Sequence, residues 1–382
     1  MRINENTLHS LPVEKKSPAL SCSEVWGEPS SNGTWWRVWA IVKRRPLGFS
    51  VKSIFALVMS ALLLAGCNHS PKNKKEKTPP PVPPQQAVVI PSFNGDSAYH
   101  YVAEQVAFGP RVPGSEAHKK CAAYLASNLE RFGASVQQQA FQMRAYNGKI
   151  LDGINIIGTI NPEANRRILL SAHWDSRPYA DQDSDEAKHR QPIDGANDGA
   201  SGVGVLLECA RAMQQTLPEV GVDIILFDLE DYGPPKDQPQ KESDGEFWGL
   251  GSQYWANNPH VFDYRAVYGI LLDMVGAQDA VFPMERFSLY YAPHIVKKVW
   301  SKAQNMGYES YFPQQEGTYI NDDHLYVNKY ANIPMIDIIH QDMASVNGTF
   351  FDHWHTMEDN ITTIDKSTLR VVGEVLMAVI YE

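Results

Sequence analysis

Two apolar runs with polar endings indicate the fold class of this chain: RILLSAHWDS at residues 167–176 and VDIILFDLED at residues 222–231. The apolar part of each run is short and aliphatic, which is typical of a strand that is buried on both faces of a sheet. The runs at residues 266–272 and 333–339 repeat this form. Strands of this kind usually belong to a parallel sheet, in which the carboxyl ends of the strands meet at one edge.

Helical spacing of apolar residues fills much of the chain around these runs. The expected helices span residues 97–108, 115–132, 200–214, 293–304 and 366–381, and two further strands span residues 136–144 and 153–160. Strands that alternate with helices predict an α/β fold. We therefore expect residues 92–382 to form a single domain with a central mixed, mostly parallel sheet and helices on both faces.

Histidine and acidic residues occupy corresponding positions after the predicted strands. They are His173, Asp198 within the run GANDGASG at residues 195–202, Glu230, Asp231, Asp273 and, in a late polar loop, His355. Zinc binds imidazole nitrogen and carboxylate oxygen, and a catalytic zinc keeps three protein ligands and one open position. Asp198, Asp231 and His355 could therefore converge on one zinc ion, with Glu230 as the neighbouring general base.

Each of these residues also has an ordinary structural explanation. An aspartate ahead of a helix, such as Asp198, commonly caps that helix. A single histidine on a loop, such as His355, commonly lies at the surface, and an acidic pair after a strand is commonly a solvated turn. The joint pattern raises the case for a metal site, but the residues alone leave both explanations open.

The order of these motifs resembles that of the secreted zinc aminopeptidases of bacteria, which use two zinc ions. The resemblance implies an aminopeptidase-like zinc hydrolase fold. It places the zinc ligands at His173, Asp198, Asp231, Asp273 and His355, and the general base at Glu230.

Further motifs bring the sequence closer to the glutaminyl cyclases, which share this fold. The matching segments are HWDS at 173–176, FDLED at 227–231, GS at 251–252, LLDMVGA at 271–277, DDH at 322–324, IP at 333–334 and WHTMEDN at 354–360. The resemblance covers roughly residues 96–382 in unbroken order, and WHTM together with DDH is its most specific part. Glutaminyl cyclases bind one zinc ion, for which the resemblance implies Asp198, Asp231 and His355 as ligands.

The resemblance implies a glutaminyl-peptide cyclotransferase, which converts the N-terminal glutamine of peptides and proteins to pyroglutamate and releases ammonia. Zinc would polarise the side-chain amide carbonyl, Glu230 would shuttle the proton, and Asp273 would hold the leaving amide nitrogen. Asp322 and Asp337 would form a polar network in which at least one carboxyl group is protonated, because clustered carboxylates resist full ionisation. Trp354 either lines the substrate pocket or packs beneath its loop.

The sequence departs from the animal glutaminyl cyclases at two positions of this site. Asp231 stands where they have glutamate, and Asp337 stands near the position of a histidine. A shorter carboxylate can still bind zinc, so Asp231 stays a ligand candidate. The disulfide of the animal enzymes cannot be placed here, and Cys121 and Cys209 are expected to be buried thiols.

Two other functions stay open from the sequence. A two-zinc aminopeptidase would use His173 and Asp273 as additional ligands, whereas in a one-zinc cyclase His173 would belong to the polar network of the substrate site. A non-catalytic binding lipoprotein of this fold is the third possibility. The retained ligand set and Glu230 argue against it.

The N-terminal part of the chain has the features of an export signal. Within residues 1–66, a basic cluster precedes an apolar run at 54–64, which is shorter than the roughly 20 residues that a bilayer span needs. The ending Leu-Ala-Gly-Cys67 resembles a bacterial lipobox, in which the cysteine is lipidated. Residues 67–91 are rich in lysine and proline, as in a solvated spacer. We expect an extracytoplasmic lipoprotein, anchored to a membrane that faces the periplasm or the cell surface; a plain anchor with an incidental Cys67 is the alternative.

Charge and composition limit the partners. A formal net charge of −10 predicts repulsion from phosphate backbones, so no nucleic acid is expected as a partner. The acidic stretch at residues 181–186 is expected to be a solvated loop near the mouth of the site. The histidines expected to lie at the surface are His100, His118, His189, His260 and His294.

Overall fold

The computed structural model describes residues 89–238 and 245–382. Within them, the chain folds into an α/β domain with a six-stranded sheet. The strands are β1 (Ser135–Arg144), β2 (Ile150–Ile160), β3 (Arg167–His173), β4 (Gly221–Phe227), β5 (Gly269–Asp273) and β6 (Met335–Ile339). Every strand expected from the sequence is present, and the two apolar runs quoted first form β3 and β4.

The sheet is mixed, and its strand order is β1-β2-β4-β3-β5-β6. Strand β3 pairs in parallel with β4 and β5, and β5 pairs in parallel with β6. Strand β2 is antiparallel to both β1 and β4. The predicted mixed, mostly parallel sheet is therefore confirmed, and the carboxyl ends of β3 to β6 lie along one edge.

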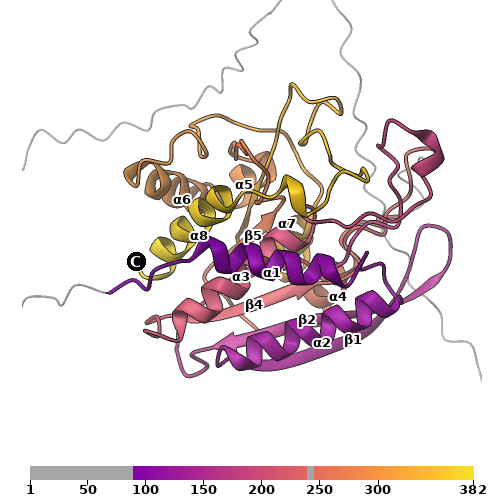
Figure 1. Ribbon diagram of the computed structural model, residues 1–382. Coiled ribbons are helices and arrows are strands. Elements are labelled where there is room, and N and C mark those ends of the chain that lie inside the picture. Colours follow the sequence, from indigo (N-terminus) through magenta and orange to yellow (C-terminus); the bar gives the residue numbers. More distant parts are fainter. Residues whose placement is uncertain (1–88, 239–244) are drawn as a thin grey trace, which may run out of the picture. The chain divides into compact units, whose positions relative to one another are not determined.

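Helices cover both faces of this sheet. Helices α1, α3 and α8 pack together over one face, as Figure 1 shows, and α4 lies against the other. The helices are α1 (Gly95–Ala107), α2 (Glu116–Arg131), α3 (Ala200–Met213), α4 (Leu250–Asn257), α5 (Arg286–Tyr291), α6 (Pro293–Asn305), α7 (Asp323–Tyr326) and α8 (Lys366–Ile380).

The alternation of side chains along the buried strands produces the two layers. On β3, Leu170 belongs to the large core beneath α1, α3 and α8, while Leu169 belongs to the smaller core beneath α4. On β5, Ile270 and Leu271 divide in the same way. Full burial of such a side chain contributes about 1.5–3 kcal/mol. Because both faces are covered, these strands appear in the sequence as continuous apolar runs.

The helix predictions agree closely with the structure where the helices are long. Ser115 caps α2 as expected, since its side chain accepts a hydrogen bond from the backbone N–H of His118. The short helices α4, α5 and α7 were not predicted. None of the helices in the described part of the chain is long and apolar enough to cross a membrane. Residues 1–66, Cys67 and most of the expected spacer at 67–91 lie outside the described residues.

Candidate active site

The parallel strands bring the predicted site residues to one edge of the sheet. His173 and Asp273 are the last residues of β3 and β5, and Glu230 and Asp231 follow β4. Asp198 reaches the same edge from the turn before α3. A pocket opens there, and the sequence-predicted residues in its wall are Asp198, Glu230, Asp231, Asp273, Asp322, Trp354 and His355.

Asp198, Asp231 and His355 form a compact group that can hold a metal ion. Nε2 of His355 lies 3.2 Å from Asp231 Oδ1 and 3.5 Å from Asp198 Oδ2, and all three side chains are buried. Oδ2 of Asp231 is buried and has no hydrogen-bond partner among the described residues, a deficit that a bound cation would remove. Two carboxylates and one imidazole fit zinc with a fourth position open.

The backbone around Asp198 directs this side chain into the site instead of onto the helix. Gly199 is the N-cap of α3, and no side chain in the described residues caps this helix end. The φ of Gly199 is 100°, and a Cβ there would lie 2.5 Å from the Asp175 carbonyl oxygen, so the turn requires glycine. The Asp359 carboxylate accepts the backbone N–H groups of Asn197 and Asp198 at 2.8 and 3.0 Å. The alternative that Asp198 is simply a helix cap is therefore wrong.

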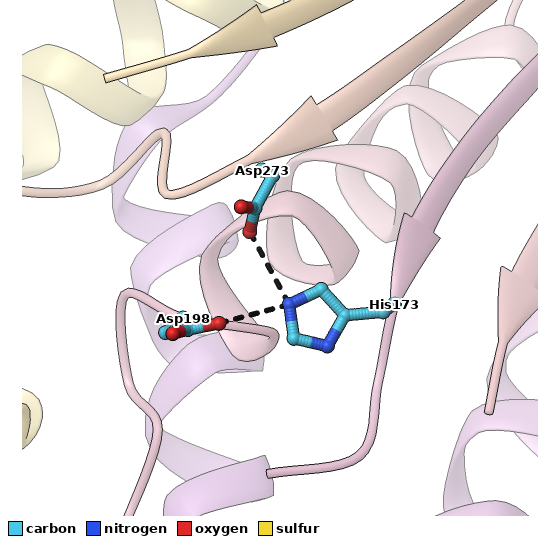
Figure 2. A group of neighbouring side chains, drawn as sticks. All are labelled: His173, Asp198 and Asp273. Atoms are coloured by element: carbon cyan, nitrogen blue, oxygen red, sulfur yellow. Dashed lines mark hydrogen bonds and ion pairs between the residues drawn. The ribbon is translucent and has the colours of Figure 1, made fainter. Parts of the chain in front are cut away.

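His173 joins Asp198 and Asp273 in a second group of possible metal ligands. Figure 2 shows its ring between the two carboxylates, with Nε2 3.0 Å from Asp198 Oδ1 and 3.2 Å from Asp273 Oδ1. Asp198 therefore offers one oxygen to His173 and the other to His355. This group can hold either a second metal ion or a proton on His173 Nε2. The residues that a two-zinc site would need are thus all in place.

Glu230 lies in the pocket wall beside the metal-binding group and is 8% exposed. The carboxylate of Asp175 holds the backbone here, because it accepts the N–H of Glu230 at 3.1 Å and that of Asp231 at 3.2 Å. Burial raises the pKa of Glu230 well above its usual range, and the carboxylates of Asp322 and Asp231 add to this effect. A carboxylate with a raised pKa takes up a proton readily, as a general base must.

Three non-glycine residues around the site adopt left-handed backbone conformations. The φ values are 59° at Leu229, 48° at Met274 and 56° at His355. Such conformations are uncommon for these residue types and cluster at functional sites. Leu229 precedes Glu230, and Met274 follows Asp273. Each of these left-handed residues is therefore next in the chain to a side chain that faces the pocket.

A buried acidic cluster extends from the pocket to β6. Asp322 lines the pocket. Asp337 lies in β6, and neither of its own carboxylate oxygens is hydrogen-bonded to a described residue. Burial, followed by the charges of Asp322 and Asp273, raises the pKa of Asp337 well above its usual range. Burial also raises the pKa of Asp273 to about 7. The residues of the predicted polar network are therefore close together, in surroundings that favour retained protons.

Aromatic side chains flank His355. Trp354 is half-buried and stacks on the His355 ring, with the ring centroids 3.8 Å apart. It therefore both lines the pocket and packs against its own loop. Trp248 also lines the pocket, and its ring is nearly parallel to that of His355 at 6.3 Å. Sequence reasoning missed Trp248, because no motif surrounds it, and missed the parts played by Asp175 and Asp359. For Asp175 the HWDS motif was the available signal.

The prediction of a surface position is wrong for His118 and for two residues of the acidic stretch at 181–186, of which residues 184–186 are exposed. His118 in α2 is 2% exposed, and its Nε2 lies 2.9 Å from Asp228 Oδ1. Within the acidic stretch at 181–186, Asp181 and Asp183 are buried. Asp181 pairs with Arg177 at 2.8 Å. Buried charged groups need such partners, and partners brought together by the fold are not visible in local composition. Cys121 and Cys209 are buried free thiols, as predicted.

The arrangement of the sheet and of the site residues points to one group of enzymes. A mixed α/β sheet with histidine and carboxylate ligands at one edge is the arrangement expected of aminopeptidase-like zinc enzymes. Residues 155–380 match the profile of peptidase family M28. The chain belongs to this family.

Within the family, the chain is similar to glutaminyl cyclases. It is 51% identical to the glutaminyl cyclase of Bacteroides thetaiotaomicron, with a TM-score of 0.74 over 77% of this chain and 99% of that chain. A Zn-dependent exopeptidase from Parabacteroides distasonis is 54% identical, with a TM-score of 0.75 over 77% and 100% of the two chains. The glutaminyl-peptide cyclotransferase of Gloydius blomhoffii is 25% identical over 304 residues, 72% of this chain and 76% of that protein. The resemblance inferred from the sequence is confirmed.

Proposed function

We propose that this chain is a glutaminyl-peptide cyclotransferase that acts on peptides and proteins with N-terminal glutamine. One observation carries the proposal: Asp198, Asp231 and His355 converge beside Glu230 in one pocket, in a chain that is 51% identical to a glutaminyl cyclase. Cyclisation needs a Lewis acid, a group that moves a proton, and a partner for the leaving nitrogen. The pocket offers residues for each of these tasks.

Zinc held by Asp198, Asp231 and His355 would polarise the amide carbonyl of the substrate side chain. Glu230 accepts a proton from the α-amine as the amine nitrogen forms its bond to the amide carbon. Glu230 then returns this proton to the amide nitrogen, which leaves as ammonia when its own bond to that carbon breaks. Glu230 lies in the pocket wall beside the three proposed ligands, so one carboxylate can serve both steps.

Asp273, Asp322 and Asp337 would support the leaving group. Asp273 lies in the pocket wall, where its carboxylate can accept a hydrogen bond from the amide nitrogen. With a proton on Nε2, His173 would donate to Asp273 and Asp198 and orient both carboxylates. Protons retained on the cluster would keep its total negative charge low enough for so many buried carboxyl groups to coexist. Trp354 would pack against the substrate side chain.

We further propose one zinc ion per chain. A proton on His173 Nε2 can serve both Asp198 and Asp273 at the observed distances, so these two carboxylates have a partner without a second ion. A two-zinc aminopeptidase is the second candidate. It is favoured by the completeness of the second ligand group and by the 54% identity to a Zn-dependent exopeptidase.

Mass spectrometry of two peptides incubated with zinc-loaded protein tests these proposals. One peptide begins with glutamine and the other with leucine. Loss of one ammonia from the first, with the second intact and one zinc per chain, is the expected result. Release of free leucine with two zinc ions per chain would move the assignment to aminopeptidase.

We also propose that the chain is an extracytoplasmic lipoprotein anchored through Cys67. The support is the basic cluster, the apolar run at 54–64 and the lipobox-like ending at Cys67. The proline-rich spacer would hold the domain away from the membrane. Metabolic labelling with a fatty acid should mark the wild-type chain and spare Cys67→Ser. A wild-type chain that takes up no label would contradict the anchor.

A further inference from the structure

Arg177, which follows β3, is a buried cation with 1% exposure. Its Nε and Nη2 atoms donate to the two oxygens of Asp181 at 2.9 and 2.8 Å. Its Nη1 atom donates to the backbone carbonyl of Asp231 at 3.1 Å and to Asp231 Oδ1 at 3.3 Å. One guanidinium group therefore contacts both the main chain and the side chain of a proposed zinc ligand.

Asp181 connects this cation to a second proposed ligand. Its Oδ1 atom lies 3.5 Å from Nδ1 of His355, whose other nitrogen, Nε2, faces Asp198 and Asp231. Two Arg177 nitrogens and the backbone N–H of Lys236 donate to Asp181 and fix its carboxylate. A metal-binding histidine whose second nitrogen faces a carboxylate is held in one tautomer and one ring orientation.

We propose that Arg177 and Asp181 form a clamp that positions two of the three zinc ligands. Arg177 orients Asp231, and Asp181 orients His355. The inference rests on the zinc ligand set of the proposed function. Asp231 is shorter than the glutamate of the animal cyclases, so its reach to the metal depends more on the position of its backbone, which Arg177 holds at the carbonyl. Both clamp residues act through the ligands and are positioning residues.

Two explanations of the clamp predict opposite effects on metal affinity. If Arg177 only balanced negative charge, its removal would leave a more negative site that attracts a divalent cation more strongly. If Arg177 positions ligands, its removal lets Asp231 and Asp181 turn away, and zinc binding weakens. Loss of a group that orients a metal ligand typically weakens metal binding by about 10–100-fold. The direction of the change therefore separates the two explanations.

The experiment measures the zinc dissociation constant of the full chain by competition with a chelator. Arg177→Met is expected to raise this constant by about 10–100-fold. Arg167→Met is a matched control, because Arg167 also donates to both oxygens of an aspartate, Asp223, at 2.6 and 2.8 Å. Arg167 lies at the start of β3, the end away from the site. Its substitution is expected to lower stability and leave zinc affinity unchanged.

Asp181→Asn keeps the shape of the side chain and serves as a second variant if Arg177→Met does not fold. It is expected to weaken zinc binding in the same range. The double variant should have a zinc dissociation constant no higher than that of the single variant that binds zinc more weakly. The effects of substituting two residues that act as one unit do not add. Unchanged or tighter zinc binding in Arg177→Met, or unchanged binding in Asp181→Asn, would overturn the clamp. Because turnover is not the readout, a zinc-binding chain without cyclase activity would overturn the proposed function and leave the clamp standing. A wild-type chain that binds no zinc would overturn both.

Discussion

Glu230 and Asp231 are neighbours in the chain but have different surroundings. Asp231 contacts Arg177 and His355, as suits a charged metal ligand. Glu230 faces the pocket, and burial raises its pKa, as suits a group that moves a proton. Burial raises the pKa of Asp231 as well, so the two carboxyl groups differ in their contacts and not in the direction of their pKa shifts. At the scale of the residue, the site depends on this difference.

Glu230→Gln should retain zinc and lose most of its cyclase activity. The amide cannot accept the proton of the α-amine, so kcat should fall by about 10²–10⁴-fold, the usual contribution of a general base. Zinc content by elemental analysis is the control and should match that of the wild type. Near-normal turnover in a zinc-loaded Glu230→Gln protein would remove this residue from the role of base.

Asp198→Ala should lose zinc. Asp365→Ala is its control. Asp365 lies directly before α8 and caps it, because its side chain accepts hydrogen bonds from the N–H groups of Ser367 and Thr368. Asp198 precedes the N-cap of α3 and caps no described helix. The control should lose about 0.5–2 kcal/mol of stability and keep its zinc. Elemental analysis of the dialysed proteins measures the difference. A full zinc content in Asp198→Ala would reject the ligand set.

At the scale of the element, Glu285 joins the segments behind the pocket. Its carboxylate caps α5 by accepting the N–H groups of Phe287 and Ser288 at 2.8 and 2.6 Å. It also accepts the N–H of Ile320, at the pocket wall, at 3.1 Å, and lies 3.0 Å from His324 Nε2 in α7. A single buried carboxylate therefore fixes α5 and α7 relative to the pocket.

Glu285→Gln should change the dependence of stability on pH in acid. Burial alone would raise the pKa of Glu285, but His324 and the N–H donors outweigh it and lower the pKa to about 2. Between pH 4.5 and about 2 the unfolded chain binds more protons at this group, so its stabilisation is present above pH 4.5 and is lost as the pH falls. Urea unfolding should show a wild-type advantage over Glu285→Gln that shrinks across this range. An advantage that is independent of pH would contradict the assignment.

At the scale of the whole molecule, the proposed zinc site joins distant segments. Asp198 precedes α3, Asp231 follows β4 and His355 lies in a loop near the C-terminal helix. A ligand that binds only the folded chain stabilises it by mass action, by about 2.7 kcal/mol at a free concentration one hundred times its dissociation constant. The metal is therefore expected to contribute to folding as well as to catalysis.

Removal of zinc with a chelator should lower the unfolding temperature of the wild type. The chelator should leave Asp198→Ala unchanged, because that variant has no zinc to lose. Differential scanning calorimetry in zinc and in chelator measures both. Equal wild-type unfolding temperatures in the two conditions would show that the metal does not bind the folded state preferentially.

The strands, the long helices and the order of the site motifs could all be predicted from the amino-acid sequence. Strands buried on both faces are apolar throughout, so β3 and β4 were visible as runs. Parallel strands end at one edge, so the residues after them could be predicted to meet. Short helices such as α4 and α7 were missed, because one or two turns give too little periodicity to recognise.

The pairing of the buried charges, in contrast, is visible only in the folded chain. His118 was expected at the surface and lies against Asp228, and Asp181 was expected in a solvated loop and is held by Arg177. An aspartate ahead of a helix allowed a cap at Asp198, but the N-cap of α3 is Gly199 and Asp198 lines the pocket instead. Periodicity encodes which side of an element faces the core, because burial follows from the local geometry of helix and strand. The partner of a buried charge comes from another part of the chain, so only the completed fold specifies it.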